Sequence, residues 1–217
     1  MTDFPALRQA MVDCQVRPSD VTRYAIIDAM LWAPREQFVP KSRREIAYTE
    51  TEIDLGNGRV VLAPRTFAKM LEAAAPGSDD LVLDLAPGAG YSTAVLSRLS
   101  AAVVAIEPDE DLVAQCADAL VANEVDNAVV AAGDPAAGDA AHGPYDVIFI
   151  GGGVETLPEA LMAQLKDGGR LVAIFMEGSV GQCRVMVRAG DSLATRYAFD
   201  ATAPVLPGFA AQDVFAF

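Results

Sequence analysis

The chain has 217 residues, of which 52% are hydrophobic and 21% charged, so its composition excludes a disordered tail. This length allows one large α/β domain, or one domain with a small additional lobe. The formal net charge of −14 repels phosphate backbones and anionic lipid, so we expect no nucleic-acid or membrane partner. Because salt screens this field within about 8 Å, the charge does not exclude a small acidic substrate.

The apolar runs and the cysteines indicate where in the cell the protein is expected to be. The longest runs, such as Leu171 to Met176, are strand-sized and well short of the roughly 18 residues that a membrane helix needs. Charged residues interrupt the apolar N-terminus, which therefore does not resemble a signal peptide. The three cysteines lie far apart without a Cys-x-x-Cys pair, which favours reduced thiols in the cytoplasm. A single histidine, His142, excludes a His-rich metal site, and we expect no metal.

Residues 1–77 are predicted to form a small helical N-terminal lobe. Ser19 is a suitable N-cap for an amphipathic helix, and Pro34 and Pro40 interrupt the pattern that follows. A second helix is predicted over residues 65–75, before a Pro-Gly pair. Because no alternating strand pattern occurs here, we expect the lobe to be mostly helical and to cover the substrate side of the main domain.

Residues 78–217 are predicted to form an α/β core. Near-continuous apolar strands separated by helices indicate a doubly wound, mainly parallel sheet, and consecutive strands after Gly181 suggest an antiparallel C-terminal edge. The predicted strands are 81–85, 102–106, 128–131, 145–150, 170–175, 183–188, 194–199 and 214–217, and the predicted helices are 91–99, 109–122 and 157–165.

The first strand of the core ends in a glycine-rich turn. Asp84 lies near the end of the strand, and Gly88 and Gly90 let the backbone approach a ligand closely. A helix that begins near Tyr91 directs its N-terminus at the same point, at the sheet edge where ligands bind in open α/β folds. The alternative interpretation is a plain glycine-rich turn.

Acidic side chains at successive strand ends favour S-adenosylmethionine over a dinucleotide. Thr93 stands where the dinucleotide fingerprint needs its third glycine, and Asp84 repels a pyrophosphate but suits the ammonium of a methionine moiety. Glu107 ends the second strand, where it can accept hydrogen bonds from both ribose hydroxyls. Asp134, after the third strand, suits the adenine amino group. Taken singly, Glu107 is also explained as a helix N-terminal charge and Asp134 as a turn aspartate.

The chain resembles the protein-L-isoaspartate O-methyltransferases over nearly its whole length. The matching segments are Met11-Val-Asp-Cys-Gln-Val-Arg17, Pro34-Arg-Glu-Gln-Phe-Val-Pro40, Gly88-Ala-Gly-Tyr91, Ala105-Ile-Glu107, Asp126-Asn127, Gly133-Asp134, Pro144-Tyr-Asp-Val-Ile148 and Gln164-Leu-Lys-Asp-Gly-Gly-Arg-Leu-Val172. The second of these segments makes the match specific, because the glycine turn alone fits many methyltransferases. The resemblance implies a Rossmann-like S-adenosylmethionine-dependent fold. The cofactor-binding residues expected on this basis are Asp84, Ala86, Gly88, Gly90, Tyr91, Glu107 and Asp134.

One segment departs from the family pattern. The family carries Thr-Ile-Ser-Gln-Pro before its long helix, where hydroxyl and backbone groups hold the substrate carboxylate. Here Val60, Leu62 and Ala63 replace the threonine, serine and glutamine, while the proline is kept. Arg59 and Arg65 flank the segment and are candidates to bind an acidic group in place of the lost hydroxyls, or else are solvated surface arginines.

The sequence therefore predicts an O-methyltransferase that acts on a carboxylate in a peptide, a protein or a small acidic molecule. A carboxylate acceptor is already ionised at neutral pH and needs no general base, so we assign no catalytic residue. The alternative is a catalytically weak or inactive S-adenosylmethionine-binding protein that acts as a sensor or scaffold. A dinucleotide-dependent reductase is a distant third possibility. The sequence predicts neither the acceptor nor the oligomeric state.

Overall fold

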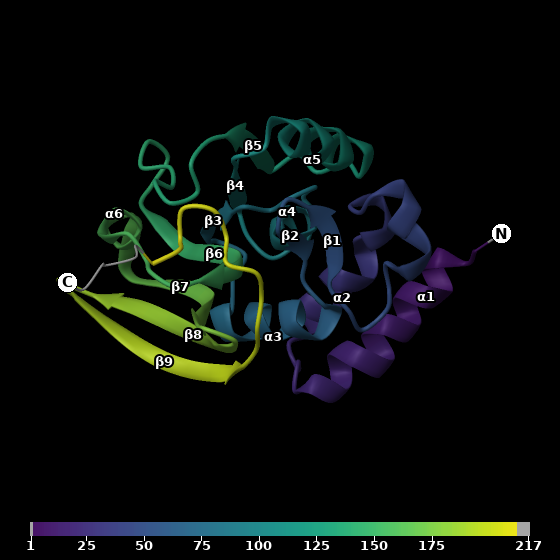
Figure 1. Ribbon diagram of the computed structural model, residues 1–217, viewed down its shortest axis with the longest axis horizontal. Helices are drawn as coiled ribbons and strands as arrows, with labels where there is room; N and C mark the ends of the chain where they lie inside the picture. Colours follow the sequence, from purple (N-terminus) through teal and green to yellow (C-terminus); the bar gives the residue numbers. More distant parts are fainter. Residues whose placement is uncertain (1, 212–217) are drawn as a thin grey trace.

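Strand β3 (Leu81–Leu85) lies inside a seven-stranded sheet in the computed structural model, which describes residues 2–211. The strand order is β5-β4-β3-β6-β7-β8-β9 (Figure 1). The pairs from β5 to β7 are parallel, whereas β7–β8 and β8–β9 are antiparallel. The predicted doubly wound, mainly parallel sheet with an antiparallel C-terminal edge is therefore confirmed. The other strands of this sheet are β4 (Ala102–Glu107), β5 (Ala128–Ala132), β6 (Tyr145–Val154), β7 (Leu165–Glu177), β8 (Val180–Ala189) and β9 (Ser192–Asp200).

Helices cover the sheet and form most of the N-terminal part of the chain. Within residues 2–211, none of them is long and apolar enough to cross a membrane. The α-helices are α1 (Phe4–Met11), α2 (Tyr24–Trp32), α3 (Pro64–Ala74), α4 (Tyr91–Ser97), α5 (Glu110–Ala122) and α6 (Glu159–Ala163). The shorter helical turns are η1 (Val12–Val16), η2 (Arg17–Ser19), η3 (Arg35–Gln37) and η4 (Lys41–Ile46).

Side chains alternate along each strand, and both faces of the central strands β3, β4, β6 and β7 are buried. One face packs against the N-terminal helices, α3, α4 and α5, and the other packs against α6 and the chain after β9. Residues on the first face include Val82, Val103, Val147 and Val172, and those on the second include Leu83, Val104, Ile148 and Leu171. This two-sided burial is why the strands read as continuous apolar runs in the sequence.

The N-terminal region differs from the prediction in two respects. Ser19 does not cap α2: it ends the turn η2, and its hydroxyl donates a 2.7 Å hydrogen bond to the carbonyl of Gln15. Residues 1–77 also contain an antiparallel hairpin, β1 (Ile53–Gly56) and β2 (Arg59–Val61), which pairs with no other described strand. These strands are too short to give a clear alternating pattern. The division at residue 77 stays a proposal, because one hydrophobic cluster spans both parts of the chain.

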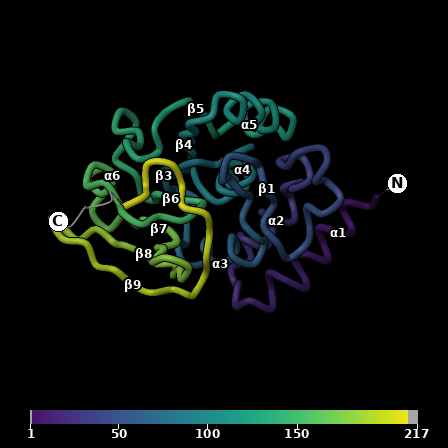
Figure 2. The backbone as a smooth tube through the Cα atoms, viewed as in Figure 1, coloured from purple at the N-terminus to yellow at the C-terminus, as the bar shows by residue number. Residues whose placement is uncertain are grey.

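After β9 the chain returns across β6 as a C-terminal strap, residues 203–209. Figure 2 shows this segment in yellow running back over the sheet. The amide of Gly153 donates to the carbonyl of Pro204, and the amide of Leu206 donates to the carbonyl of Gly153, each at 2.9 Å. A Cβ at Gly153 would lie 2.6 Å from the carbonyl oxygen of Ala203, so only glycine allows this approach. The strand predicted at 214–217 lies outside the described residues.

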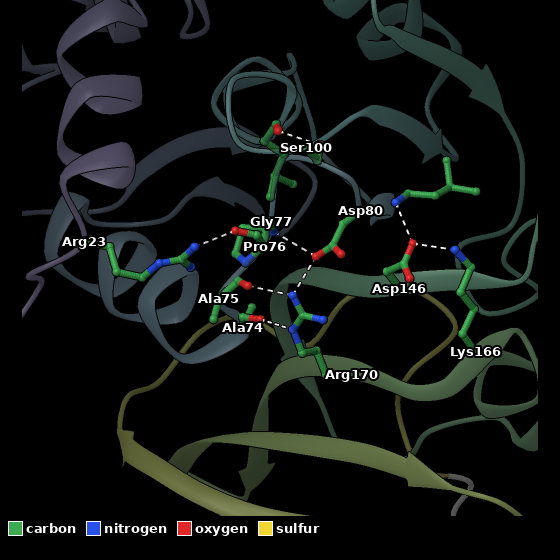
Figure 3. Close-up of polar contacts among 12 residues, drawn as sticks. Arg23, Ala74, Ala75, Pro76, Gly77, Asp80, Ser100, Asp146, Lys166 and Arg170 are labelled. Atoms are coloured by element: carbon green, nitrogen blue, oxygen red, sulfur yellow. Dashed lines mark hydrogen bonds and ion pairs between the residues drawn. The ribbon is translucent and has the colours of Figure 1, made fainter.

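An arginine at the amino-terminal edge of the sheet ties α3 to β3 (Figure 3). The Arg170 guanidinium lies 2.6 Å from an Asp80 carboxylate oxygen and also donates to the carbonyls of Ala74 and Ala75. Ala75 adopts a left-handed conformation with φ 49 at the end of α3, which leaves the last carbonyls of the helix in need of partners. Arg170 therefore closes the C-terminus of α3 at the edge opposite the glycine turn.

We predict that Arg170→Gln lowers the free energy of unfolding by about 1–3 kcal/mol, because charge-assisted bonds to half-buried groups are lost. The matched control is Arg184→Gln, whose partner Glu177 has a side chain that is 78% exposed. Such an exposed pair contributes less than about 1 kcal/mol. Chemical denaturation of both variants makes the comparison, and equal losses would contradict the proposed role of Arg170.

Candidate functional site

The turn between β3 and α4 places three left-handed residues at the carboxyl end of the sheet. Ala86, Gly88 and Gly90 have φ values of 58, 62 and 96. A Cβ at Gly90 would lie 2.5 Å from the sulfur of Cys116 on α5, so the turn packs directly against that helix. The predicted tight glycine turn is therefore present. Its close packing against α5 explains why position 90 has glycine, which carries no side chain.

Asp84 is fully buried at the end of β3 and is only partly satisfied. One carboxylate oxygen accepts hydrogen bonds from the hydroxyls of Ser92 at 2.7 Å and Thr93 at 2.8 Å. The other oxygen, Oδ1, has no hydrogen-bond partner among residues 2–211. Burial raises the pKa of this carboxyl to about 7, although the two hydroxyls act in the opposite direction. Thr93, which departs from the dinucleotide fingerprint, thus serves as a donor to Asp84.

Glu107, at the end of β4, is fully buried and paired with Arg59 of the hairpin. The two guanidinium nitrogens of Arg59 lie 2.7 Å and 2.9 Å from the two carboxylate oxygens. Arg59 also donates to the carbonyl of Ala86 at 2.8 Å, and the amide of Gly88 donates to Glu107 at 2.8 Å. The hairpin, the glycine turn and β4 therefore meet at one buried carboxylate.

The hairpin also closes the space above the turn. A Cβ at Gly88 would lie 2.6 Å from Cδ1 of Leu55, which shows how closely this side chain covers the glycine. A cavity of about 20 Å³ remains beneath the hairpin, with room for about one water molecule. Its lining includes Val60, Leu62, Phe67, Ala86, Tyr91 and Gly151.

The altered segment is held in place by a buried arginine. Arg35 donates 2.7 Å hydrogen bonds to the carbonyls of Ala47 and Leu62, and its guanidinium lies 4.8 Å from the centre of the Tyr91 ring. Arg35 belongs to the Pro34–Pro40 segment that matches the family, but the sequence alone predicts no role for its side chain. A buried arginine is predicted only when its carbonyl partners are known, and these lie 12 and 27 residues further along the chain.

The other predicted site residues do not line this cavity. Asp134 is exposed in the loop after β5, where it accepts a 2.9 Å hydrogen bond from the amide of Ala136. Ala63 is half-buried at the start of α3, and Arg65 is exposed on that helix. His142 is exposed beside Asp139. Among residues 2–211, no group of three or more His, Cys, Asp or Glu side chains is arranged to hold a metal ion.

The strand order, the glycine turn after β3 and the acidic strand ends define a Rossmann-like methyltransferase fold. A solved structure of a protein-L-isoaspartate O-methyltransferase superposes with a TM-score of 0.80 at 22% identity, covering 93% of this chain and 67% of that chain. A Plasmodium falciparum protein described with the same activity, crystallised with S-adenosyl-L-homocysteine, has a TM-score of 0.78 at 18% identity and covers 96% and 100%.

The sequence comparisons identify the family within that class. The family model of the protein-L-isoaspartate(D-aspartate) O-methyltransferases matches residues 7–199. A protein-L-isoaspartate O-methyltransferase of Roseiflexus castenholzii is 35% identical over 210 residues, covering 96% of this chain and 95% of the relative. One from Pelotomaculum thermopropionicum is 36% identical over 184 residues, covering 85% and 80%. The chain belongs to this family, as its motifs predicted.

We predict that Asp84→Asn changes the pH dependence of stability. Because the pKa of Asp84 is raised from 3.8 to about 7, the folded protein keeps a proton that the unfolded chain loses between pH 4 and 7. The wild-type protein therefore loses stability as the pH rises through this window, by at most about 1.4 kcal/mol per pH unit, and the dependence is flat above it.

The variant lacks this contribution. The difference in unfolding free energy, wild type minus variant, should therefore decrease from pH 4 to pH 7 in denaturation experiments. Asp191→Asn, which removes one exposed carboxyl, is the matched control. A difference that stays constant from pH 4 to pH 7 would show that Asp84 is ionised in the folded protein throughout this range.

Proposed function

We propose that this protein is an S-adenosylmethionine-dependent O-methyltransferase whose acceptor is a carboxylate of a peptide, a protein or a small acidic molecule. The observation that carries this proposal is the unpartnered Oδ1 of the buried Asp84, at the turn where this family is expected to hold its cofactor. An unsatisfied buried carboxylate is costly, and a ligand ammonium group is a suitable partner for it. The free cysteine thiols, two of them buried, support a cytoplasmic location.

The residues at the turn fit the cofactor in chemistry. Asp84 suits the ammonium of the methionine moiety, Glu107 suits the ribose hydroxyls, and Asp134 suits the adenine amino group. Gly88 and Gly90 keep side chains away from the ligand. The cavity beside the turn is about 20 Å³, against about 300–1,000 Å³ for small-molecule sites. Leu55 and Arg59 of the hairpin also lie against Gly88 and Glu107. Binding therefore requires the hairpin to move.

The protein contributes to the reaction by positioning the acceptor against the methyl group and by removing water from around them. The cofactor supplies an activated methyl group when it is bound. The apolar side chains of Val60, Leu62 and Phe67 line the cavity, which has room for no more than about one water molecule. A carboxylate acceptor has a pKa of about 4, so it attacks as an anion and needs no base. Tyr91 lines the cavity and its ring packs against the Arg35 guanidinium, so its hydroxyl is a candidate to hold the acceptor.

A second candidate function is binding of the cofactor without methyl transfer, in a sensor or scaffold. The apolar character of Val60 and Leu62 favours it, because these side chains offer no hydrogen bond to a carboxylate. Conversion of S-adenosylmethionine to S-adenosylhomocysteine in the presence of an isoaspartyl peptide distinguishes the two functions. Binding without conversion supports the second.

We predict that methylation of isoaspartyl peptides is weak, and that Leu62 is the main cause. The Leu62 side chain is buried and faces the cavity where the family carries a serine, so the acceptor loses water without gaining a donor. Loss of one or two charge-assisted bonds lowers catalytic efficiency by roughly ten- to several-hundred-fold. The variant Val60→Thr, Leu62→Ser, Ala63→Gln should recover part of that activity.

The measurement is methyl incorporation into a synthetic isoaspartyl peptide, with the same peptide containing ordinary aspartate as a control. Equal affinity of the wild type and the variant for S-adenosylhomocysteine verifies that the three substitutions leave cofactor binding unchanged. Wild-type activity equal to that of an ordinary family member would refute the prediction. If both proteins bind the cofactor normally and neither is active, the acceptor pocket differs in more than these three side chains.

A further inference from the structure

The β1–β2 hairpin has the properties of a movable cover. It forms a two-stranded sheet of its own, and two-stranded hairpins are marginally stable alone. Its turn, Asn57-Gly58, has φ values of 52 and 71, as in the tight turns that favour Asn-Gly, and the tip from Gly56 to Gly58 is exposed. Ile53 and Val61 anchor the base of the hairpin in the core, so the part that can change position is residues 54–60. Its movement does not break the pairing of the seven-stranded sheet.

Two side chains hold this cover against the glycine turn. Leu55 provides the apolar contact, over Gly88. Arg59 provides the polar contact, with both guanidinium nitrogens on Glu107 and one also on the carbonyl of Ala86. Because Arg59 and Glu107 are both buried, this bidentate pair is protected from solvent and from screening by salt.

The pair occupies the atoms that a bound nucleoside requires. Each carboxylate oxygen of Glu107 already accepts from Arg59, and the amides of Gly88 and Asp109 take further acceptor positions at 2.8 Å and 3.2 Å. With two donors on each oxygen, the acceptor positions of the carboxylate are filled, so ribose hydroxyls would bind Glu107 only by displacing Arg59. Arg59 and the ribose therefore exclude one another.

We infer that the β1–β2 hairpin is a gate on the cofactor site, and that Arg59 is its latch, in competition with the cofactor ribose for Glu107. This inference rests on the proposed function. Opening the gate breaks a buried charge-assisted pair, so part of the cofactor's binding energy is used to release Arg59. Arg59 is thus a residue that sets cofactor affinity, and its side chain leaves Glu107 when the cofactor binds.

The test compares Arg59→Gln and Arg59→Lys with the wild type. Arg59→Gln removes the charge and the guanidinium fork, so we expect S-adenosylhomocysteine to bind at least about tenfold more tightly in titration calorimetry. Arg59→Lys keeps the charge but not the bidentate geometry, and its affinity should lie between the two. The control is Arg43→Gln, an exposed arginine of the same region, which should bind like the wild type.

A second measurement needs no ligand. Hydrogen exchange of the amides in residues 53–61 should be about tenfold faster in Arg59→Gln than in the control, because the latch is absent. Unchanged exchange would overturn the latch, even if the variant were less stable overall. Equal or weaker S-adenosylhomocysteine binding by Arg59→Gln would overturn the competition. Failure of every protein to bind S-adenosylhomocysteine would refute the proposed function itself, and the gate with it.

Discussion

Two carboxylates buried side by side are the constraint on which the rest of this structure depends. Asp84 and Glu107 end neighbouring parallel strands, and neither has access to water. The two carboxylates have different partners. Glu107 is paired with the Arg59 guanidinium, whereas Asp84 accepts hydrogen bonds from two hydroxyls and its pKa stays raised. The position of the hairpin and the choice of residues at the start of α4 both follow from this need to compensate buried negative charge.

The centre of the sheet was predictable from the sequence because its strands are buried on both faces. The bounds of β3 agree with the prediction, and Glu107 was correctly placed at the end of the next strand. The N-terminal region was less predictable, since its structure depends on contacts between distant residues. Ser19 has the chemistry of a helix cap, but its hydroxyl bonds to a carbonyl in the preceding turn instead. The hairpin strands have four and three residues, too few to show a period.

The candidate site was predictable in its residue types but not in its pairings. Glycines and acids at strand ends follow from local chemistry, whereas the contact of Arg59 with Glu107 joins residues 48 positions apart. Arg59 looked like a surface residue or a substrate contact, because nothing in its immediate neighbourhood indicates a buried partner. The cavity that remains is bounded by Val60 and Leu62, whose importance could be recognised only against the pattern of the family.

The C-terminal strap has a consequence for how this protein is made. Strand β6 is completed by backbone contacts with residues that follow β9, and Gly153 has no side chain there because the strap lies against it. A ribosome delivers the chain from its N-terminus, so the face of the sheet covered by Leu206 and Phe209 stays uncovered until those residues have emerged. This face of the core is therefore completed only after β9 has been made, and a nascent chain stalled after β9 would present an apolar surface to chaperones.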